Sequence, residues 1–217
     1  MRRHLSEHDA RRFLVAGPVA LLTTKWRGVP DVMPVAWSMP LSAEPPLVGV
    51  MVHPSRHSHD MIRWSEEFAL NFPGPELLNH VAYFGSVSGA AVAKLDVSKL
   101  PTLPARKVEA PLLEGCVAWV ECGVEDAIRL GDHTLFVGRV QAVSADDEAF
   151  NETWLLENEA RPLHYLGGLL YATLEKRLEA RPPSPSGTNV GEEFDRQRAE
   201  ESEREAEERA EWEARGE

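Results

Sequence analysis

The chain has 217 residues, of which 43% are apolar and 27% are charged, and its formal net charge is −12. This length and composition indicate one soluble globular domain that is large enough to bury a hydrophobic core. The acidic balance argues against nucleic acid as a partner, because like charges repel, although a local basic cluster could still hold one small phosphate.

The first part of the chain predicts a short helix followed by three strands. Ser6 can cap the helix, which stops at Gly17. Apolar runs rich in β-forming residues predict strands over Val19–Thr24, Asp31–Trp37 and Leu47–Val52, the last one buried on both faces. The first two strands form a hairpin around the turn Trp26–Gly28, and Pro34 indicates a sheet edge or a bulge.

The middle of the chain mixes helices with further strands. A helix is expected over His59–Glu66, with Met61, Ile62 and Trp64 packing inward. The other expected elements are a strand at Phe68–Phe72, a helix from Pro75 to Tyr83 or Phe84, a loop at Gly85–Gly89, a short helix at Ala90–Leu95, long strands at Cys116–Ile128 and His133–Ser144, and a short strand or loop at Tyr165–Tyr171.

These elements predict a mainly β fold with about six or seven strands. Strands and helices do not alternate regularly, so a parallel sheet of βαβ units is disfavoured and a closed antiparallel barrel with appended helices is favoured. We expect one domain over residues 1–180. Residues 181–217 form a Pro/Ser linker and a Glu/Arg-rich tail, either disordered or a solvated helix, with a partner-binding or solubilising arm as the alternative.

Two features bear on the compartment. Cys116 and Cys122 on one strand would lie roughly 20 Å apart, too far for a disulfide, so we expect two small buried side chains. No apolar run reaches the roughly 18 residues of a membrane span, and no apolar signal-peptide segment follows the polar residues Met1 to His4. A cytoplasmic protein without membrane contact is expected.

Two segments could hold an anion. Ser55, Arg56, His57 and Ser58 follow a buried strand at the start of a helix, where amide groups, hydroxyls and a guanidinium can cradle a phosphate; an ordinary capped turn is the alternative. The loop Gly85–Gly89 adds two hydroxyls, and Lys94 adds a charge. Neither segment has the spacing of a Walker or dinucleotide-binding loop.

Three further residue groups could line a binding cleft. Trp37, followed by Ser38 and Met39, could form the wall of a flat-ligand site, although for this residue in isolation a core tryptophan is the favoured interpretation. His133 at a strand start could point into a cleft or serve structure alone. The histidines near residue 57 lack any HExxH or CxxC pattern, so we expect no metal site.

Taken together, these motifs resemble the flavin reductase-like family in order and spacing, and within it the flavoredoxins. The resemblance covers about residues 10–173 and leaves out the tail. The matching stretches are Leu21–Thr24, Asp31–Trp37, Pro54–Ser58, Gly85–Gly89 with Lys94, Gly131–Gly138 and Pro162–Gly168.

The resemblance implies a dimeric, antiparallel, Greek-key split β-barrel that binds FMN near the subunit interface. The implied cofactor contacts are Trp37 beside the isoalloxazine, the backbone of Ser38 and Met39 at its polar edge, Arg56, His57 and Ser58 on the phosphate with help from Ser88 and Lys94, His133 facing the flavin as the catalytic residue, and Tyr165 closing over it.

One position departs from the family pattern. The chain has Asp31 where the family often has Asn. An ionised carboxylate only accepts hydrogen bonds, whereas an amide also donates, so the implied contact of Asp31 with the flavin is open. Its negative charge should disfavour reduced, anionic flavin, and His133 or Lys94 could supply the opposing positive charge.

The implied function is an FMN-dependent oxidoreductase of the flavin-reductase type that takes electrons from NADH or NADPH. The flavin carries the redox chemistry, which accounts for the absence of a nucleophile–base pair in the sequence. Two alternatives stay open: an electron carrier that is reduced by a protein partner, and a flavin-binding protein without turnover. A single phosphate cradle favours FMN over FAD.

Overall fold

The computed structural model describes residues 6–180 and 190–215, and the chain divides into two compact units, Met1–Lys176 and Arg177–Glu217. The second unit contains the helix α5 (Val190–Arg215), which is one of the two conformations expected for the tail. The expected Pro/Ser linker begins at residue 181 and lies outside the described residues. No helix in the described ranges has both the length and the apolar character that crossing a membrane requires.

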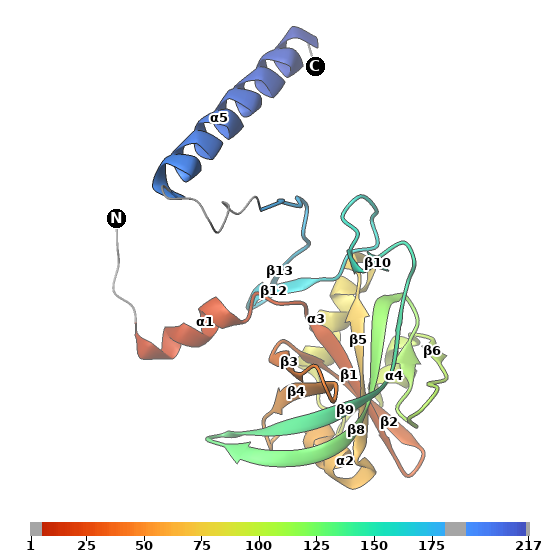
Figure 1. The fold of residues 1–217 in the computed structure, drawn as a ribbon. Coiled ribbons are helices and arrows are strands. Elements are labelled where there is room, and N and C mark those ends of the chain that lie inside the picture. The colour runs from red at the N-terminus through yellow and green to blue at the C-terminus, as the bar shows by residue number, and fades with distance from the viewer. Residues whose placement is uncertain (1–5, 181–189, 216–217) are drawn as a thin grey trace. The chain divides into compact units, whose positions relative to one another are not determined.

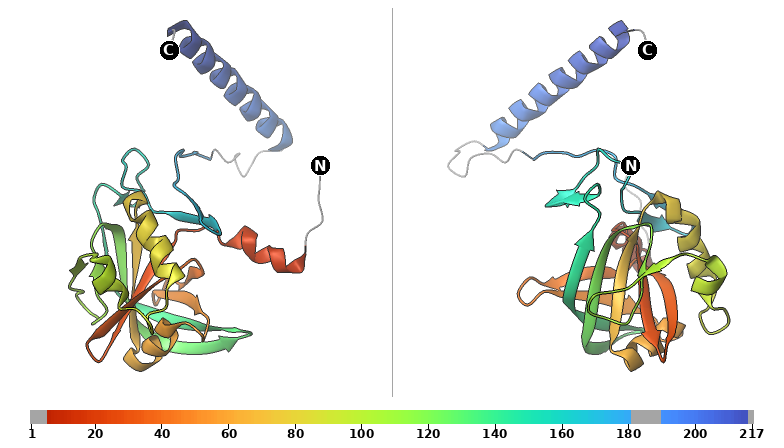
Figure 2. Two further views of the ribbon diagram at one scale, coloured as in Figure 1. Left: turned by 180° about the vertical axis from the view of Figure 1, so that it is seen from behind. Right: turned by 90° about the vertical axis from the view of Figure 1, so that its right-hand side faces the viewer.

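The first unit is built on one seven-stranded antiparallel sheet, with the strand order β2-β1-β5-β8-β9-β4-β3 (Figure 1). The sheet curves around a hydrophobic core, with α3 along one flank (Figure 2). Its strands are β1 (Ala20–Trp26), β2 (Val29–Val35), β3 (Ser38–Ser42), β4 (Leu47–Val52), β5 (Glu67–Pro73), β8 (Cys116–Leu130) and β9 (His133–Ala145). The predicted mainly β, antiparallel class is confirmed.

Short helices and strand pairs complete this unit. The helices are α1 (Ala10–Leu14), α2 (His57–Ser65), α3 (Leu78–Ser86) and α4 (Lys94–Ser98), and single 3-10 turns are η1 (Glu7–Asp9) and η2 (Pro75–Leu77). The strand pairs are β6 (Thr102–Leu103) with β7 (Leu112–Leu113), β10 (Phe150–Asn151) with β11 (Thr153–Trp154), and β12 (His164–Gly167) with β13 (Leu170–Ala172).

The two predicted hairpins form as expected. Arg27 and Gly28 both have positive φ, which is the turn geometry that matches the twist of β1 and β2. Gly131 makes the corresponding turn between β8 and β9. Pro34 lies in β2, which is an edge strand of the sheet, as the sequence predicts.

Several local expectations are corrected. Trp64 does not pack inward: its side chain is 53% exposed and lies against Trp26, with 6.2 Å between the ring centroids. The short helix starts at Lys94 instead of Ala90, and α3 runs on through Ser86. β4 is buried at Gly49, Val50 and Val52 and only partly buried at its other three positions, so its two faces are covered to different degrees.

The core and the cysteines follow the predicted pattern. Phe68, Phe84 and Phe136 are among the largest side chains that are fully buried. Cys116 and Cys122 are free and buried in β8. Burial raises the pKa of each thiol to about 12, so both remain protonated near neutral pH and behave as small apolar side chains.

Candidate functional site

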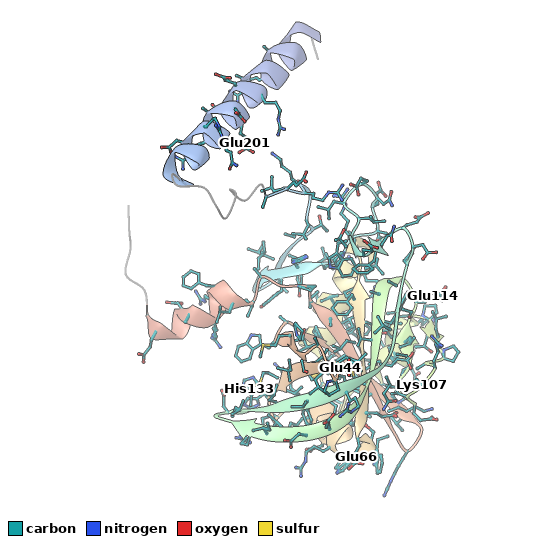
Figure 3. The ribbon with its side chains drawn as sticks, viewed as in Figure 1. Glu44, Glu66, Lys107, Glu114, His133 and Glu201 are labelled. Atoms are coloured by element: carbon teal, nitrogen blue, oxygen red, sulfur yellow. The ribbon has the colours of Figure 1, made fainter. Side chains whose placement is uncertain are left out.

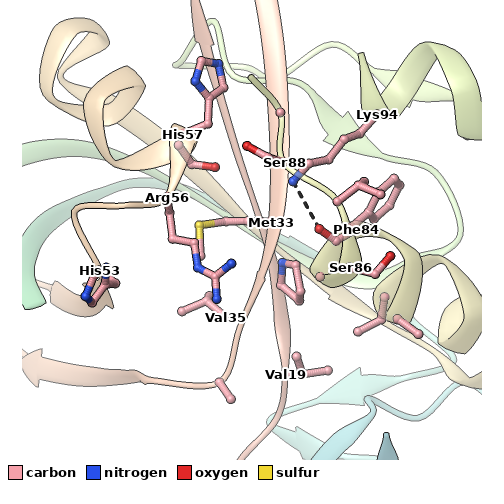
Figure 4. A pocket seen from close by; sticks show the side chains of 18 of the residues that line it. Val19, Met33, Val35, His53, Arg56, His57, Phe84, Ser86, Ser88 and Lys94 are labelled. Carbon is pink, nitrogen blue, oxygen red and sulfur yellow. Dashed lines mark hydrogen bonds between the residues drawn. The ribbon is translucent and has the colours of Figure 1, made fainter. Parts of the chain in front are cut away.

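One cavity of about 620 Å³ collects most of the polar residues that the sequence singles out. It lies between the end of β2, the start of α2, the end of α3 with the loop after it, the start of β9, and the β12–β13 hairpin. Figure 4 shows Arg56 reaching toward Met33 and Val35, with Ser88 and Lys94 from the opposite side. Segments far apart in sequence therefore form one site.

One wall of the cavity is aromatic. The rings of Trp37 and His133 lie 4.9 Å apart between centroids and are inclined by 30°, while His53 meets His133 edge-on at 5.1 Å. His133 begins β9 (Figure 3), and the distance from its Nδ1 to Oδ1 of Asp132 is 2.7 Å. A carboxylate only accepts hydrogen bonds, so the Nδ1 of His133 carries a proton.

A second hydrogen bond orients His53. The backbone N–H of Ser55 donates to His53 Nδ1 over 3.1 Å, so in the neutral ring the proton is on Nε2. The Ser55 hydroxyl also lies 2.7 Å from the same Nδ1. These contacts hold His53 beside His133, and together the two imidazoles and Trp37 give the cavity an aromatic wall that carries polar ring nitrogens.

The opposite end of the cavity favours an anion. Arg56 is the N-cap residue of α2 and its side chain makes no capping hydrogen bond, which leaves the first amide groups of the helix available. Ser88 Oγ accepts the N–H of Ala90 over 3.3 Å, so its own O–H is free to donate. Within residues 6–180 and 190–215, Arg56 has no ion pair, and its guanidinium is exposed to the cavity.

Beneath this end lies a buried polar cluster formed by Asp31, Ser58 and Lys94. The Ser58 hydroxyl donates to Asp31 Oδ2 over 2.6 Å, and Lys94 Nζ lies 3.8 Å from Asp31 Oδ1. Lys94 Nζ also donates to the carbonyls of Val32 at 2.7 Å and Phe84 at 3.1 Å. Burial lowers the pKa of Lys94, and the negative charge of Asp31 partly opposes that shift.

The β12–β13 hairpin lines another side of the cavity. Tyr165 and Tyr171 are paired across the hairpin, and their ring centroids lie 5.4 Å apart. Burial raises the pKa of Tyr171, and the nearby Tyr165 contributes in the same direction. Gly167 and Gly168 have positive φ, and the turn at Gly168 and Leu169 brings both rings to the cavity.

Most of the predicted site residues line this single cavity. They are Asp31, Trp37, Arg56, His57, Ser58, Ser88, Lys94, His133 and Tyr165. Ser38 and Met39 do not line it: they lie in β3 and pair with Val50 and Gly49 of β4, and Met39 is 56% exposed. Their positions in this chain therefore do not support the expectation that these two residues contact the cofactor.

Some residues that line the cavity were not predicted from the sequence as site residues. His53 directly follows the predicted strand that ends at Val52, which is the same signal that identified Arg56. Tyr171 could have been found from Tyr165, because a turn at Gly168 and Leu169 places the two tyrosines opposite each other. Ser86 was assigned to a loop, but it ends α3 and donates its hydroxyl hydrogen to the Tyr83 carbonyl over 2.8 Å.

Comparisons with known proteins agree with this picture. A family model described as "Flavin reductase like domain" matches residues 11–173. The Escherichia coli (strain K12) protein YddH is 33% identical over 180 residues, which cover 80% of this chain and 95% of YddH.

Two solved structures are similar to the first unit. An FMN-binding protein from Thermus thermophilus, crystallised with bound 1-cyclohex-2-enone, is 28% identical and has a TM-score of 0.71; the match covers 83% of this chain and 99% of that one. A flavoredoxin from Methanosarcina acetivorans shares the fold at 23% identity and a TM-score of 0.68, over 80% of this chain and 91% of its own.

Proposed function

The chain belongs to the flavin reductase-like family of FMN-binding split-barrel flavoproteins, and from this membership we propose that it is an FMN-dependent oxidoreductase. The family that the sequence resembles is thereby confirmed. One observation carries the proposal for this chain: a single cavity joins an aromatic wall to an end that favours an anion.

The residues present fit FMN in size and chemistry. A volume of about 620 Å³ lies within the range of roughly 300 to 1,000 Å³ that holds small ligands. The rings of Trp37 and His133 offer an aromatic surface for an isoalloxazine, and Arg56 with the first amides of α2 suits a phosphate. One anion-binding end favours FMN, with one phosphate, over FAD.

The side chains of the cavity would bind, orient and exclude water. FMN, when bound, supplies the redox chemistry, and the protein supplies orientation and electrostatics. Trp37 and His133 would cover part of one ring face, and Tyr165 would close the site from the β12–β13 hairpin. The bond from His133 to Asp132 keeps a proton on Nδ1 and leaves Nε2 as the second polar atom of that ring.

We propose that NADH or NADPH is the electron donor, because the chain belongs to a family of the flavin-reductase type. Anaerobic addition of either nucleotide to the FMN-loaded protein should bleach the visible flavin absorbance rapidly. His133→Ala should slow this bleaching while FMN stays bound. Val29→Ala, at a 60% exposed position away from the cavity, should behave as the unaltered protein.

Three results separate the possible functions. Rapid bleaching by a nucleotide supports the reductase. Bleaching by a reduced redox protein, but by neither nucleotide, would instead identify an electron carrier. A purified chain that takes up no FMN would overturn the proposal as a whole.

We further propose that the protein acts as a homodimer. Large apolar side chains are exposed together on the β12–β13 hairpin, which lines the cavity: Leu169 is 79% exposed, Leu170 68% and Leu166 52%. Such a grouping is costly in water and is typical of a surface that another chain covers. Light scattering should give twice the mass of one chain, and a monomer would contradict this proposal.

A further inference from the structure

The buried cluster under the anion-binding end has a geometry that the family resemblance does not explain. The carboxylate of Asp31, which is 4% exposed, touches three separate segments. It accepts the Ser58 hydroxyl from α2, lies 3.8 Å from Lys94 at the start of α4, and packs directly against Gly89 in the loop after α3. All three segments border the end of the cavity that favours an anion.

The ammonium of Lys94 is held inside the protein. It donates hydrogen bonds to the carbonyls of Val32 and Phe84 and makes an ion pair with Asp31 at 3.8 Å, which is too long for a hydrogen bond, and the side chain is only 4% exposed. Ser58 is 1% exposed and donates its only hydroxyl hydrogen to Asp31. Ser58 could bind a phosphate directly only by giving up its hydrogen bond to Asp31, and Lys94 only by turning its remaining N–H group away from Asp31 or by breaking a buried hydrogen bond.

The charge of Asp31 needs compensation. A buried carboxylate close to a phosphate would repel it, and burying an unpaired charge is strongly unfavourable. Lys94 is the cation that faces Asp31, and Arg56 lies near enough to affect the titration of Lys94. The pair Asp31–Lys94 therefore leaves the cavity floor with no net charge, and Arg56 remains to meet an anion.

Building on the proposed FMN site, we infer that Asp31 and Lys94 form a charge-neutral positioning pair that fixes the phosphate-binding segments, and that Lys94 is not itself a phosphate ligand. The phosphate is held instead by Arg56, by the free hydroxyl of Ser88 and by the first amides of α2. The role of Lys94 is to neutralise Asp31 and to tie β2 and α3 to α4.

A double-mutant cycle on the full chain tests this inference. The dissociation constants of FMN and of riboflavin, which has the same ring but no phosphate, are measured for the unaltered protein, Lys94→Gln, Asp31→Asn and the double variant. Lys94→Gln alone leaves Asp31 unpaired and should weaken FMN binding at least about tenfold, with a much smaller effect on riboflavin. The double variant should recover most of the FMN affinity, because no charge remains unpaired.

Arg56→Gln serves as the matched control for a direct ligand. It should weaken FMN binding, and adding Asp31→Asn should not restore the affinity as it does for Lys94→Gln.

If the double variant Asp31→Asn with Lys94→Gln binds FMN as weakly as Lys94→Gln alone, Lys94 is a phosphate ligand and the inference is wrong. Equal losses for FMN and riboflavin would also overturn the inference, because the pair would then support the site in general and not its phosphate-binding segments. If the unaltered protein binds neither FMN nor riboflavin, the proposed function itself fails.

Discussion

Replacing Gly89 by alanine is expected to weaken FMN binding roughly tenfold to a hundredfold, since overpacking a tight contact costs about 1–3 kcal/mol. A Cβ at this position would overlap the carboxylate of Asp31. Asp31 cannot move aside easily, because Ser58 and Lys94 hold it on both oxygens. The loop must therefore shift, and it carries Ser88 away from the phosphate. Titration of FMN fluorescence measures the affinity.

The matched control for this substitution is Gly17→Ala. A Cβ at Gly17 would meet no atom within 4 Å, so the same chemical change should leave both FMN affinity and stability unaltered. Similar affinities for Gly89→Ala and Gly17→Ala would show that the loop tolerates the extra carbon, and that the close approach of Gly89 to Asp31 does not control the site.

Truncating Phe68 to alanine should lower the free energy of unfolding by about 3–5 kcal/mol. Phe68 is 0% exposed and belongs to the hydrophobic core cluster that the curved sheet surrounds. Its ring fills the space that a side chain at position 138 would need, since a Cβ on Gly138 would overlap the ring. Alanine would leave a cavity there. Urea unfolding followed by circular dichroism measures the change.

Phe13→Ala provides the comparison for the core variant. The Phe13 side chain is 70% exposed, so its removal should change the free energy of unfolding very little. If both variants lost the same stability, the loss could not be assigned to core packing. A neutral Phe68→Ala would mean that the sheet collapses into the vacated space.

The sequence was sufficient for elements whose residues carry a local signal. Continuous apolar runs identified β1, β4 and β5, and turn residues identified the two hairpins. β3 was missed because Ser38–Ser42 is short, mostly exposed and contains Pro40. Its strand conformation comes from pairing with β4, and such a long-range contact leaves no periodic pattern in the strand itself.

The candidate site likewise combines residues that the sequence could predict with contacts that it could not. Trp37, Arg56 and His133 could be selected because their residue types and neighbouring elements point to a cleft, and all three line the cavity. The sequence indicated Lys94 as a phosphate contact but could not show its ion pair with Asp31. The two residues are distant in sequence and become neighbours only in the folded chain. A charged residue can be identified from sequence, but the opposite charge that pairs with it depends on tertiary structure.

The way Lys94 closes on β2 also affects how the protein behaves at high concentration. β2 is an edge strand, and an edge normally offers free N–H and C=O groups to a strand from another molecule. Pro30 and Pro34 have no N–H to offer, and the Val32 carbonyl is occupied by Lys94. An incoming strand therefore finds fewer donors and acceptors along this stretch, so intermolecular sheet extension and aggregation at this edge are disfavoured.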